Sequence, residues 1–465
     1  MKFREWFIES VTPFTMQANI PIPDEVKIIS RILKAYDPKA EVYAVGGAVR
    51  DFLYNTFHGQ GKPYKPKDVD VTTNLAEEEI LAACGLPQQN VRPQTPLAQQ
   101  LCQQHGVRVK EKESVDTFGV AFVVVGDAPV VEVAPFRKDI GSADGRRPER
   151  VERGTIHDDA MRRDFTINNL YYDFDKGVVI DLNPNAQGIE DIKNGPVIRP
   201  VGNPFDRFNE DKLRVLRLMR FFARFNTGDI RQFLDQQTLK AIEHFKNLQA
   251  HGITPERIMT EFTGGIKQSL ETSSFLANYA ALDLYPAVFP GMRVNTQHIQ
   301  RIGNSKNVKV IYAMLLWGND NISKRLNALK YPVPINEGVR FLIDLMNFNP
   351  ASIADLTKAR ERLGKMQPQA IGDADIQELA QIANGLIDVR RIQHLIGYQP
   401  PQVSGQELMK QGFQGPAIGQ RQRELLQQHY GTSWQDYQPQ QPQPTNRPEF
   451  PTRFDPRKTP GDTQS

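Results

Sequence analysis

Short apolar runs separated by tight turns dominate the chain from about residue 24 to 183. The run Val42–Val45 predicts a short buried strand, because consecutive apolar and aromatic residues end at a glycine pair. Gly46-Gly47 closes this strand, and residues 48–53 begin a helix. The order of strand, glycine turn and helix predicts an α/β region in this part of the chain.

Two further strand patterns lie in the same region. Residues 68–73 alternate polar and apolar side chains, which is the period of a strand. The apolar runs 120–125 and 130–133 flank Gly126-Asp127 and predict a hairpin. Residues 90–117 are polar and rich in Gln and Lys without a clear period, and we expect a long loop there.

A helical period replaces the strand patterns from about residue 206 onward. Leu213, Leu216, Met219 and Phe222 recur every three residues and predict a helix with one apolar face. Prolines and glycines interrupt the later apolar sets, so we expect several helices in series. The C-terminal half is therefore predicted to be all-α, and its Gln/Pro-rich end to be disordered.

The composition is that of a globular protein. The 465 residues carry a formal net charge of +3, and this length predicts roughly two to four domains. Because the charge is nearly balanced, a nucleic-acid partner would have to meet a local basic surface. The two cysteines, Cys84 and Cys102, argue against a disulfide scaffold or a Cys-rich zinc site and fit a reducing cytoplasm. No apolar run is long enough to span a bilayer, so we expect a cytoplasmic protein without a membrane partner.

Two aspartates, Asp68 and Asp70, carry the first candidate chemistry. They follow the Gly46-Gly47 turn in sequence, and strand alternation places both carboxylates on one face. Oxygen ligands on one face suit Mg²⁺ ions that also bind substrate phosphates, and backbone N–H groups at a glycine turn suit a triphosphate. Each motif alone is also compatible with an ordinary tight turn or a solvated edge strand; their order favours a two-metal phosphoryl-transfer site.

Glu132 is a third candidate carboxylate. It lies on the predicted strand 130–133 among apolar neighbours. There it would complete the metal site or act as a base on the attacking hydroxyl. The alternative is a glutamate on the open face of a hairpin.

The segment Arg162–Asn168 is dense in charge. Asp164 and Asn168 are four residues apart, so on a helix they share a side and offer an acceptor and an amide to a ribose. Arg162 and Arg163 would bind phosphates bidentately. The alternative is the ordinary charge pattern of a helix start.

The segment Glu210–Arg217 has a more specific spacing. On a helix, Asp211 and Arg214 share a face, and Glu210 lies four residues before Arg214 and fixes it. A carboxylate beside a guanidinium offers an acceptor and donors in one plane, as reading a nucleobase edge requires. Arg217, Arg220 and Arg224 continue the basic stripe. The alternative is a set of surface ion pairs on an exposed helix.

Six segments in one order resemble the tRNA nucleotidyltransferase and poly(A) polymerase family, of the class shared by bacteria and eukaryotes. The resemblance spans about 180 residues. The segments are Gly46–Asp51, Asp68–Asp70, Glu132–Arg137, Asp144–Pro148, Arg162–Asn168 and Glu210–Arg217.

The resemblance implies an α+β fold: a polymerase-β-like nucleotidyltransferase head, with a mixed sheet and helices, followed by all-α neck, body and tail. The expected divisions are a head at 1–183, a neck that binds RNA and nucleotide at 184–295, a helical body and tail at 296–437, and a disordered tail at 438–465.

The resemblance also implies roles for the site residues. Asp68 and Asp70 would hold two Mg²⁺ ions, with Glu132 as a third catalytic carboxylate. The base of the incoming ATP or CTP would pair with Asp211 and Arg214, steadied by Glu210. The remaining nucleotide-binding residues implied are Gly46, Gly47, Arg50, Arg162, Arg163, Asp164, Asn168 and Arg217.

Two features favour CCA addition to the 3′ end of tRNA over poly(A) synthesis. Poly(A)-making members usually carry a Gly-Arg-Arg-Phe-like segment before the Glu-containing strand, whereas residues 116–122 read Asp-Thr-Phe-Gly-Val-Ala-Phe. Residues 403–409 and 415–419 resemble a tail segment of many bacterial CCA-adding enzymes. The alternatives are a poly(A) polymerase using ATP, a partial enzyme adding only C-C or only A, and a silent RNA-binding protein.

Overall fold

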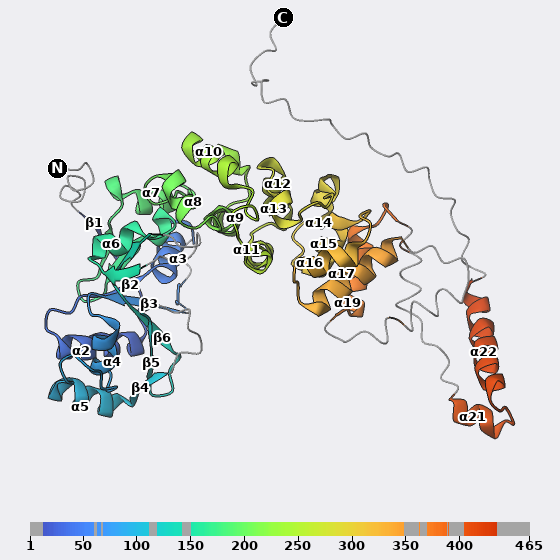
Figure 1. The fold of residues 1–465 in the computed structure, drawn as a ribbon, viewed down its shortest axis with the longest axis horizontal. Coiled ribbons are helices and arrows are strands. Elements are labelled where there is room, and N and C mark those ends of the chain that lie inside the picture. Colours follow the sequence, from blue (N-terminus) through green and yellow to red (C-terminus); the bar gives the residue numbers. More distant parts are fainter. Residues whose placement is uncertain are drawn as a thin grey trace, which may run out of the picture. The chain divides into compact units, whose positions relative to one another are not determined.

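The computed structural model describes residues 13–59, 63–66, 68–110, 119–141, 150–347, 362, 370–387, 389 and 404–434. The chain divides into two compact units, with the division between Ile343 and Asp344. Figure 1 labels the helices and strands along the chain. The first unit contains the sheet and most of the helices, and it carries every candidate site residue.

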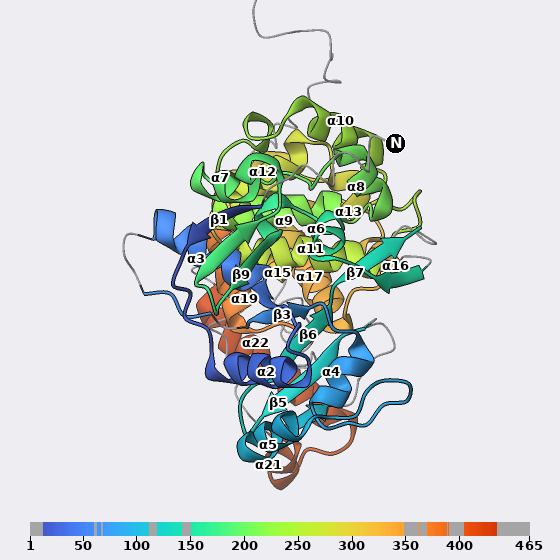
Figure 2. The ribbon, with the colours of Figure 1, turned by 90° about the vertical axis from the view of Figure 1, so that its left-hand side faces the viewer.

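An eight-stranded mixed sheet organises the N-terminal part of the first unit (Figure 2). Its strand order is β1-β10-β9-β2-β3-β6-β5-β4, and β3 and β6 are parallel while the other neighbours are antiparallel. The strands are β1 (Phe14–Gln17), β2 (Val42–Val45), β3 (Asp70–Thr73), β4 (Val107–Lys110), β5 (Ala121–Val125), β6 (Val131–Pro135), β9 (Leu170–Asp173) and β10 (Val178–Asp181). A separate ribbon pairs β7 (Arg137–Ile140) with β8 (Arg150–Arg153).

Helices cover this sheet with their apolar faces. Helix α2 buries Val26, Ile29, Ile32 and Leu33, and it packs against β5 and α5. The helices of this region are α2 (Asp24–Tyr36), α3 (Gly47–His58), α4 (Glu77–Ala83), α5 (Pro96–His105), α6 (Ile156–Met161) and α7 (Gln187–Lys193), with the 3₁₀ turns η1 (Thr166–Asn168) and η2 (Pro184–Ala186).

The described residues after α7 form helices. The first unit continues with α8 (Pro204–Glu210), α9 (Arg214–Phe225), η3 (Ile230–Gln232), α10 (Gln236–Phe245), α11 (Pro255–Gln268), α12 (Thr272–Ala281), α13 (Tyr285–Val288), η4 (Thr296–His298), α14 (Ile299–Ile302), α15 (Val308–Leu316) and α16 (Ile322–Ala328). Helix α17 (Val333–Met346) reaches the division, and the second unit contains α19 (Asp373–Ile382), α21 (Gly405–Lys410) and α22 (Pro416–Trp434). The predicted α+β fold, a mixed-sheet head followed by helices, is confirmed.

Several element predictions are confirmed, and others differ from the structure. The strand Val42–Val45, the 120–133 hairpin and the helix through Leu216, Met219 and Phe222 are present, but that helix begins at Arg214, one residue after Leu213. The strand predicted over 68–73 begins at Asp70. The loop predicted for 90–117 instead contains α5 and β4, which forms one edge of the sheet. Thr95 caps α5 by accepting a hydrogen bond from the N–H of Ala98, and Pro96 occupies the first turn.

Some predictions fall on residues that the structure does not describe. These are residues 111–118 of the expected loop, the Asp144–Pro148 motif and the Gln/Pro-rich tail. Within the described parts of the chain, no helix combines the length and the apolar character needed to cross a membrane.

Candidate active site

The candidate site is built around the turn between β2 and α3. Gly46 has a φ of 73° and a ψ of −125°, a conformation that residues with a side chain rarely adopt. A Cβ built on Gly46 would stand 3.8 Å from Oδ2 of Asp70 and 3.9 Å from Nη1 of Arg163. A carboxylate and a guanidinium therefore meet at this glycine.

Sheet register brings Asp70 and Glu132 to one edge, and Asp68 lies just before the strand that carries Asp70. Asp70 lies opposite Val45, the last residue of β2, and Asp68 precedes β3 by two residues. Because Val71 pairs with Val133 in the parallel β3–β6 ladder, Glu132 follows the same face as Asp70. Partial burial raises the pKa of Glu132, and the charges of Asp70 and Asp68 raise it further. The three acids therefore lie within electrostatic reach of one another, as the sequence predicts.

The carboxylates at this edge fit Mg²⁺ only if further ligands come from water and substrate. Among the described residues, no three His, Cys, Asp or Glu side chains converge closely enough to hold a metal by themselves. Desolvation raises the pKa of Asp70, Arg163 lowers it, and Asp68 raises it, so the pair of aspartates carries mutual repulsion that a cation would relieve. Magnesium keeps several waters and takes substrate phosphates as ligands. The residues fit Mg²⁺ as part of a site that substrate oxygens complete.

Arg162 and Arg163 follow α6 and are held by a buried aspartate. Oδ1 of Asp159 accepts hydrogen bonds from Nε and Nη2 of Arg162 at 2.9 and 2.5 Å. Oδ2 accepts from Nη2 of Arg163 and from the hydroxyl of Tyr171, both at 2.8 Å. Burial acts to raise the pKa of Asp159, but the two guanidinium groups outweigh it and hold that pKa below its usual value. Asp159 is not among the residues predicted from the sequence, although its position three and four residues before the two arginines is visible there.

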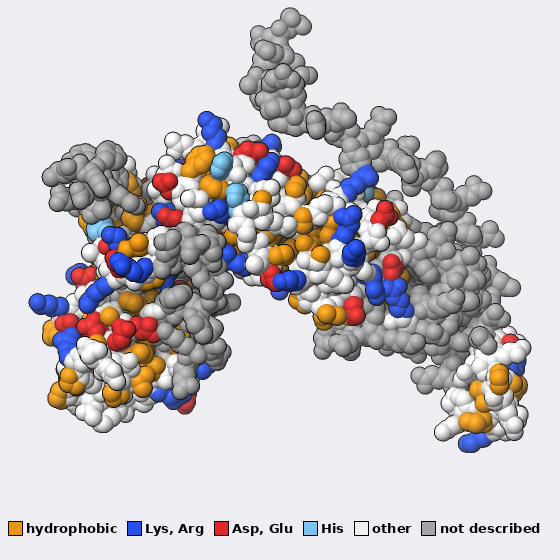
Figure 3. Space-filling view, in the orientation of Figure 1, with side chains coloured by type: hydrophobic (Ala, Val, Ile, Leu, Met, Phe, Trp, Pro, Cys, Tyr) orange, Lys and Arg blue, Asp and Glu red, His pale blue; other side chains and the backbone are white. Residues whose placement is uncertain are grey.

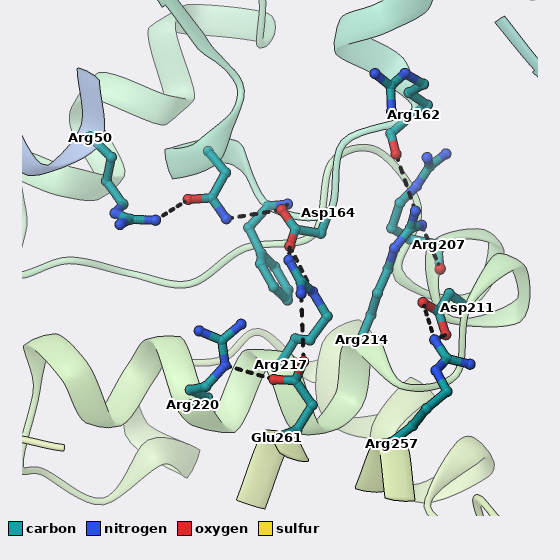
Figure 4. Close-up of polar contacts among 12 residues, drawn as sticks. Arg50, Arg162, Asp164, Arg207, Asp211, Arg214, Arg217, Arg220, Arg257 and Glu261 are labelled. Carbon is teal, nitrogen blue, oxygen red and sulfur yellow. Dashed lines mark hydrogen bonds and ion pairs between the residues drawn. The ribbon is translucent and has the colours of Figure 1, made fainter. Parts of the chain in front are cut away.

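Asp164 and Asn168 contact each other, but they do not lie on the α-helix that the sequence predicted. Phe165 is extended and residues 166–168 form only the 3₁₀ turn η1. Oδ1 of Asp164 accepts from Nδ2 of Asn168 at 2.9 Å, and Oδ1 of Asn168 accepts from Nη1 of Arg50 at 2.6 Å. These amide and carboxylate groups therefore connect α3 to η1 (Figure 4).

The arginines of α9 are bound by acids from other elements. Nε and Nη2 of Arg217 donate to Oδ2 of Asp164 at 3.0 and 2.6 Å, and its Nη1 lies 3.6 Å from Oε1 of Glu261 on α11 (Figure 4). Arg220 donates to Oε2 of Glu261 at 2.6 Å, and Arg224 to Oδ2 of Asp51 at 2.7 Å. These contacts tie the sheet-bearing part of the unit to α9 and α11.

The predicted helix through Glu210 and Arg217 is interrupted. Helix α8 ends at Glu210 and α9 begins at Arg214, so Asp211 lies in the turn between them. Glu210 still accepts from Nη1 of Arg214 at 2.9 Å, as predicted. Arg214 also donates to the carbonyl oxygens of Arg207 at 2.9 Å and Arg162 at 3.1 Å. Its guanidinium is thereby held in one orientation.

Asp211 has a partner that sequence spacing did not suggest. Nη2 of Arg257, on α11, lies 3.3 Å from Oδ1 and 3.2 Å from Oδ2 of Asp211 (Figure 4). Oδ1 also accepts from the N–H of Leu213 at 3.1 Å. Arg257 and Glu261 lie one turn apart on α11, which is a visible helical spacing, but nothing local in the sequence indicates which residues of α8 and α9 they meet.

Comparison with known proteins gives this arrangement a family. A family model described as the poly(A) polymerase head domain matches residues 42–199. The CCA-adding enzyme of Ligilactobacillus salivarius is 30% identical over 336 residues, which cover 67% of this chain and 70% of that enzyme. The chain belongs to the tRNA nucleotidyltransferase and poly(A) polymerase family.

Members of the family with either activity are similar to this chain. The CCA-adding enzyme of Enterococcus faecalis is 34% identical over 268 residues, 55% of this chain and 54% of that enzyme. Poly(A) polymerase I of Salmonella typhi is 30% identical over 310 residues, 64% of this chain and 55% of that enzyme. The chain thus spans about half the length of these curated relatives.

Solved structures of the family show the same fold. The CCA-adding enzyme of Bacillus stearothermophilus, solved in complex with CTP, superposes with a TM-score of 0.59 at 21% identity and covers 88% of this chain and 92% of that one. The Thermotoga maritima enzyme, solved with tRNA, gives a TM-score of 0.60 at 17% identity and covers 92% and 97%. At sequence identities this low, the superpositions show a shared fold and no more.

Proposed function

We propose that the protein adds C, C and A to the 3′ end of tRNA from CTP and ATP. The observation that carries the proposal is the extent of its likeness to CCA-adding enzymes. The enzyme of Pediococcus pentosaceus is 26% identical over 432 residues, which cover 86% of this chain and 92% of that enzyme. The match to the Salmonella typhi poly(A) polymerase I covers only 55% of that enzyme.

The glycine turn and the two arginines after α6 would bind the nucleotide's phosphates. Gly46 is the N-cap of α3 and Gly47 its first residue, so the N–H groups of the first turn of α3 lie at the glycine turn, where an anion is favoured. Arg163 stands beside this turn, and Arg162 shares its buried aspartate partner. In this proposal Arg50, Asp164 and Asn168 fix η1 beside the nucleotide's sugar, since their polar groups bond one another.

The carboxylates of Asp68 and Asp70 would hold two Mg²⁺ ions, with Glu132 as the third acid at the same edge. Bound magnesium would neutralise charge on the phosphates and make the attacking hydroxyl a better nucleophile by favouring its deprotonated form. The hydroxyl at the RNA 3′ end attacks the α-phosphate of the nucleotide, the new phosphodiester bond forms and pyrophosphate leaves. The protein's own contribution is to hold phosphates, sugar and base in line for this displacement.

Asp211 and Arg214 would select the base. Cytosine and adenine both present an amino donor next to a ring-nitrogen acceptor, whereas uracil and guanine present a carbonyl next to an N–H. A carboxylate accepts from the amino group, and a guanidinium donates to the ring nitrogen. Glu210 and two carbonyl oxygens hold Arg214, so its donors are fixed before the base arrives. Arg217, bonded to Asp164, holds α9 against η1.

The expected divisions into head (1–183), neck (184–295), body and tail (296–437) and terminal tail (438–465) are part of this proposal, with the long helical part offering a surface for tRNA. We also propose a cytoplasmic location. The free thiols of Cys84 and Cys102 are both buried, which fits a reducing compartment.

A poly(A) polymerase using ATP is the second candidate, because poly(A) polymerase I enzymes share the matched region at about the same identity. Incubation with Mg²⁺ and labelled CTP or ATP, separately and together, separates the two. The RNA substrates are tRNA lacking its 3′ end and an unstructured oligoribonucleotide. Growth by three nucleotides that then stops, on tRNA only, supports CCA addition. Long A tracts on either RNA would establish poly(A) synthesis, and absence of incorporation would overturn both.

A further inference from the structure

Asp159 is a charged residue that the chemistry above does not use directly. Its side chain is fully buried, and a buried carboxylate is tolerated only when it is paired and hydrogen-bonded. Both of its oxygens are occupied: Oδ1 by Arg162, and Oδ2 by Arg163 and the hydroxyl of Tyr171. Tyr171 is buried as well and accepts from Nε of Arg163 at 3.0 Å. Two arginines, one aspartate and one tyrosine thus form a closed group with one excess positive charge.

This group lies beside the candidate site, with Tyr171 on the strand next but one to the strand of Asp70. Tyr171 lies opposite Val45 in the β2–β9 ladder, and Val45 lies opposite Asp70 on its other side. Asp159 and Tyr171 engage Nε and Nη2 of Arg163, while Nη1 of the same guanidinium points to Gly46. One edge of the guanidinium is therefore anchored in the protein, and the other edge faces the glycine turn.

The geometry of a guanidinium explains why anchoring one edge of Arg163 orients the other edge. A guanidinium has five N–H donors in a fixed plane, so two bonds along one edge set the direction of the remaining donors. Without a buried acid, two neighbouring guanidinium groups would repel each other and would have to be ordered when a phosphate binds. Ordering a long side chain on binding lowers affinity. A carboxylate shared by both arginines removes that cost before the nucleotide arrives.

We propose that Asp159, locked by Tyr171, is a positioning residue that orients Arg162 and Arg163 toward the phosphates of the incoming nucleotide. The inference rests on the proposed nucleotidyl transfer and assigns to Asp159 a specific share in it. Asp159 sets nucleotide affinity through the two arginines, and the displacement at the α-phosphate proceeds without direct contact to it.

The test compares Asp159→Asn with a matched buried acid. Asp173, two residues beyond Tyr171 on β9, is also buried and ion-paired, with Lys176 at 2.9 Å, and it lies toward the end of β9 away from Gly46. Asp173→Asn therefore removes a buried charge outside the site. Tyr171→Phe is the milder second variant: it removes the two hydrogen bonds of the hydroxyl, to Asp159 and from Arg163, but keeps the ring and both ion pairs of Asp159. Each protein is measured for melting temperature, KM and kcat with CTP and ATP, and equilibrium affinity for ATP without RNA.

We expect Asp159→Asn to raise KM and weaken ATP binding by about tenfold, the effect of ordering one to two arginine side chains, with a smaller change in kcat. Tyr171→Phe should shift both in the same direction by a smaller factor. Asp173→Asn should lower the melting temperature without changing KM or the affinity for ATP. Equal KM and equal ATP affinity in the Asp159 and Asp173 variants would overturn the positioning role. Wild-type ATP affinity in both Asp159→Asn and Tyr171→Phe, with both variants folded, would overturn it as well.

The same measurements separate this inference from the proposed function. Wild-type protein that binds ATP but adds no nucleotide to RNA would overturn the transfer, and the ATP affinities of the variants would then still decide the role of Asp159. Wild-type protein that binds no ATP would overturn both.

Discussion

Replacement of Arg214 by alanine tests whether the turn between α8 and α9 reads the base. The substitution removes a guanidinium bonded to the carboxylate of Glu210 and to the carbonyl oxygens of Arg207 and Arg162. The backbone of α9 should remain helical, because alanine is the best helix former. What disappears is the donor that would face the ring nitrogen of cytosine or adenine.

The size of the effect follows from the contacts. A well-placed pair of hydrogen bonds to a base edge contributes about 1–3 kcal/mol of discrimination, so selectivity for CTP over UTP should fall by roughly 5- to 150-fold. The three acceptors left behind lose a charged partner, which costs about 1–3 kcal/mol of stability. Selectivity and stability should therefore both fall, and they must be separated.

Arg220→Ala provides the matched control. Arg220 lies on the same helix, its side chain is 15% exposed like that of Arg214, and it is also bound to a glutamate, Glu261. Its loss should lower stability to a similar degree and leave base preference unchanged.

The assay adds one nucleotide at a time. tRNA lacking its 3′ end, or ending in C-C, is incubated with CTP, ATP, UTP or GTP alone, and kcat/KM is compared between wild type and both variants, alongside thermal unfolding. Unchanged ratios in Arg214→Ala would refute the assignment of Arg214 to base selection. An equal loss of selectivity in Arg220→Ala would show that general loosening of α9, rather than a specific donor, sets the preference.

Three further predictions concern the acids of the site. Alanine at both Asp68 and Asp70 should abolish nucleotide addition while RNA affinity in a filter-binding assay stays nearly unchanged; retained incorporation would place the catalytic site elsewhere. Asp70→Asn should raise the melting temperature at pH 7. The folded-state pKa of Asp70 is raised, so ionisation destabilises the fold above that pKa, and the gain should vanish at pH values below the ordinary pKa of an aspartate, where wild type is protonated too. Arg217→Met should lower stability by about 3 kcal/mol in denaturant unfolding, because it leaves Asp164 partly buried without its guanidinium; a loss below about 0.5 kcal/mol would mean that the pair is not formed in solution.

The incorrect loop prediction for residues 90–117 has a local explanation. The apolar face of α5 is narrow and set among glutamines, so the polar composition outweighed the helical period. Signals for both elements were nevertheless present: Thr95-Pro96 is a helix start, and Val-Arg-Val-Lys at 107–110 alternates like a strand. An edge strand with one polar face gives a weaker pattern than a central one.

The turn at Asp211 shows a different kind of limit. Spacing correctly predicted that Glu210 and Arg214 meet, because residues four apart are neighbours on a helix and remained so across the turn. Spacing did not predict that the chain leaves the helix at Asp211. There the carboxylate bonds the N–H of Leu213 and faces Arg257, a partner 46 residues away.

The sequence by itself determined the elements that depend on local chemistry: the glycine turn after β2, the strand that carries Asp70, the hairpin with Glu132 and the apolar face of α9. It also determined the order of motifs that identifies the family. Only the tertiary structure decided which polar side chains of different elements meet. The hydroxyl of Tyr171 on Asp159, Arg257 on Asp211 and Glu261 between two arginines are contacts made by packing of distant elements, and the periodicity of a single segment contains no information about the element it will face.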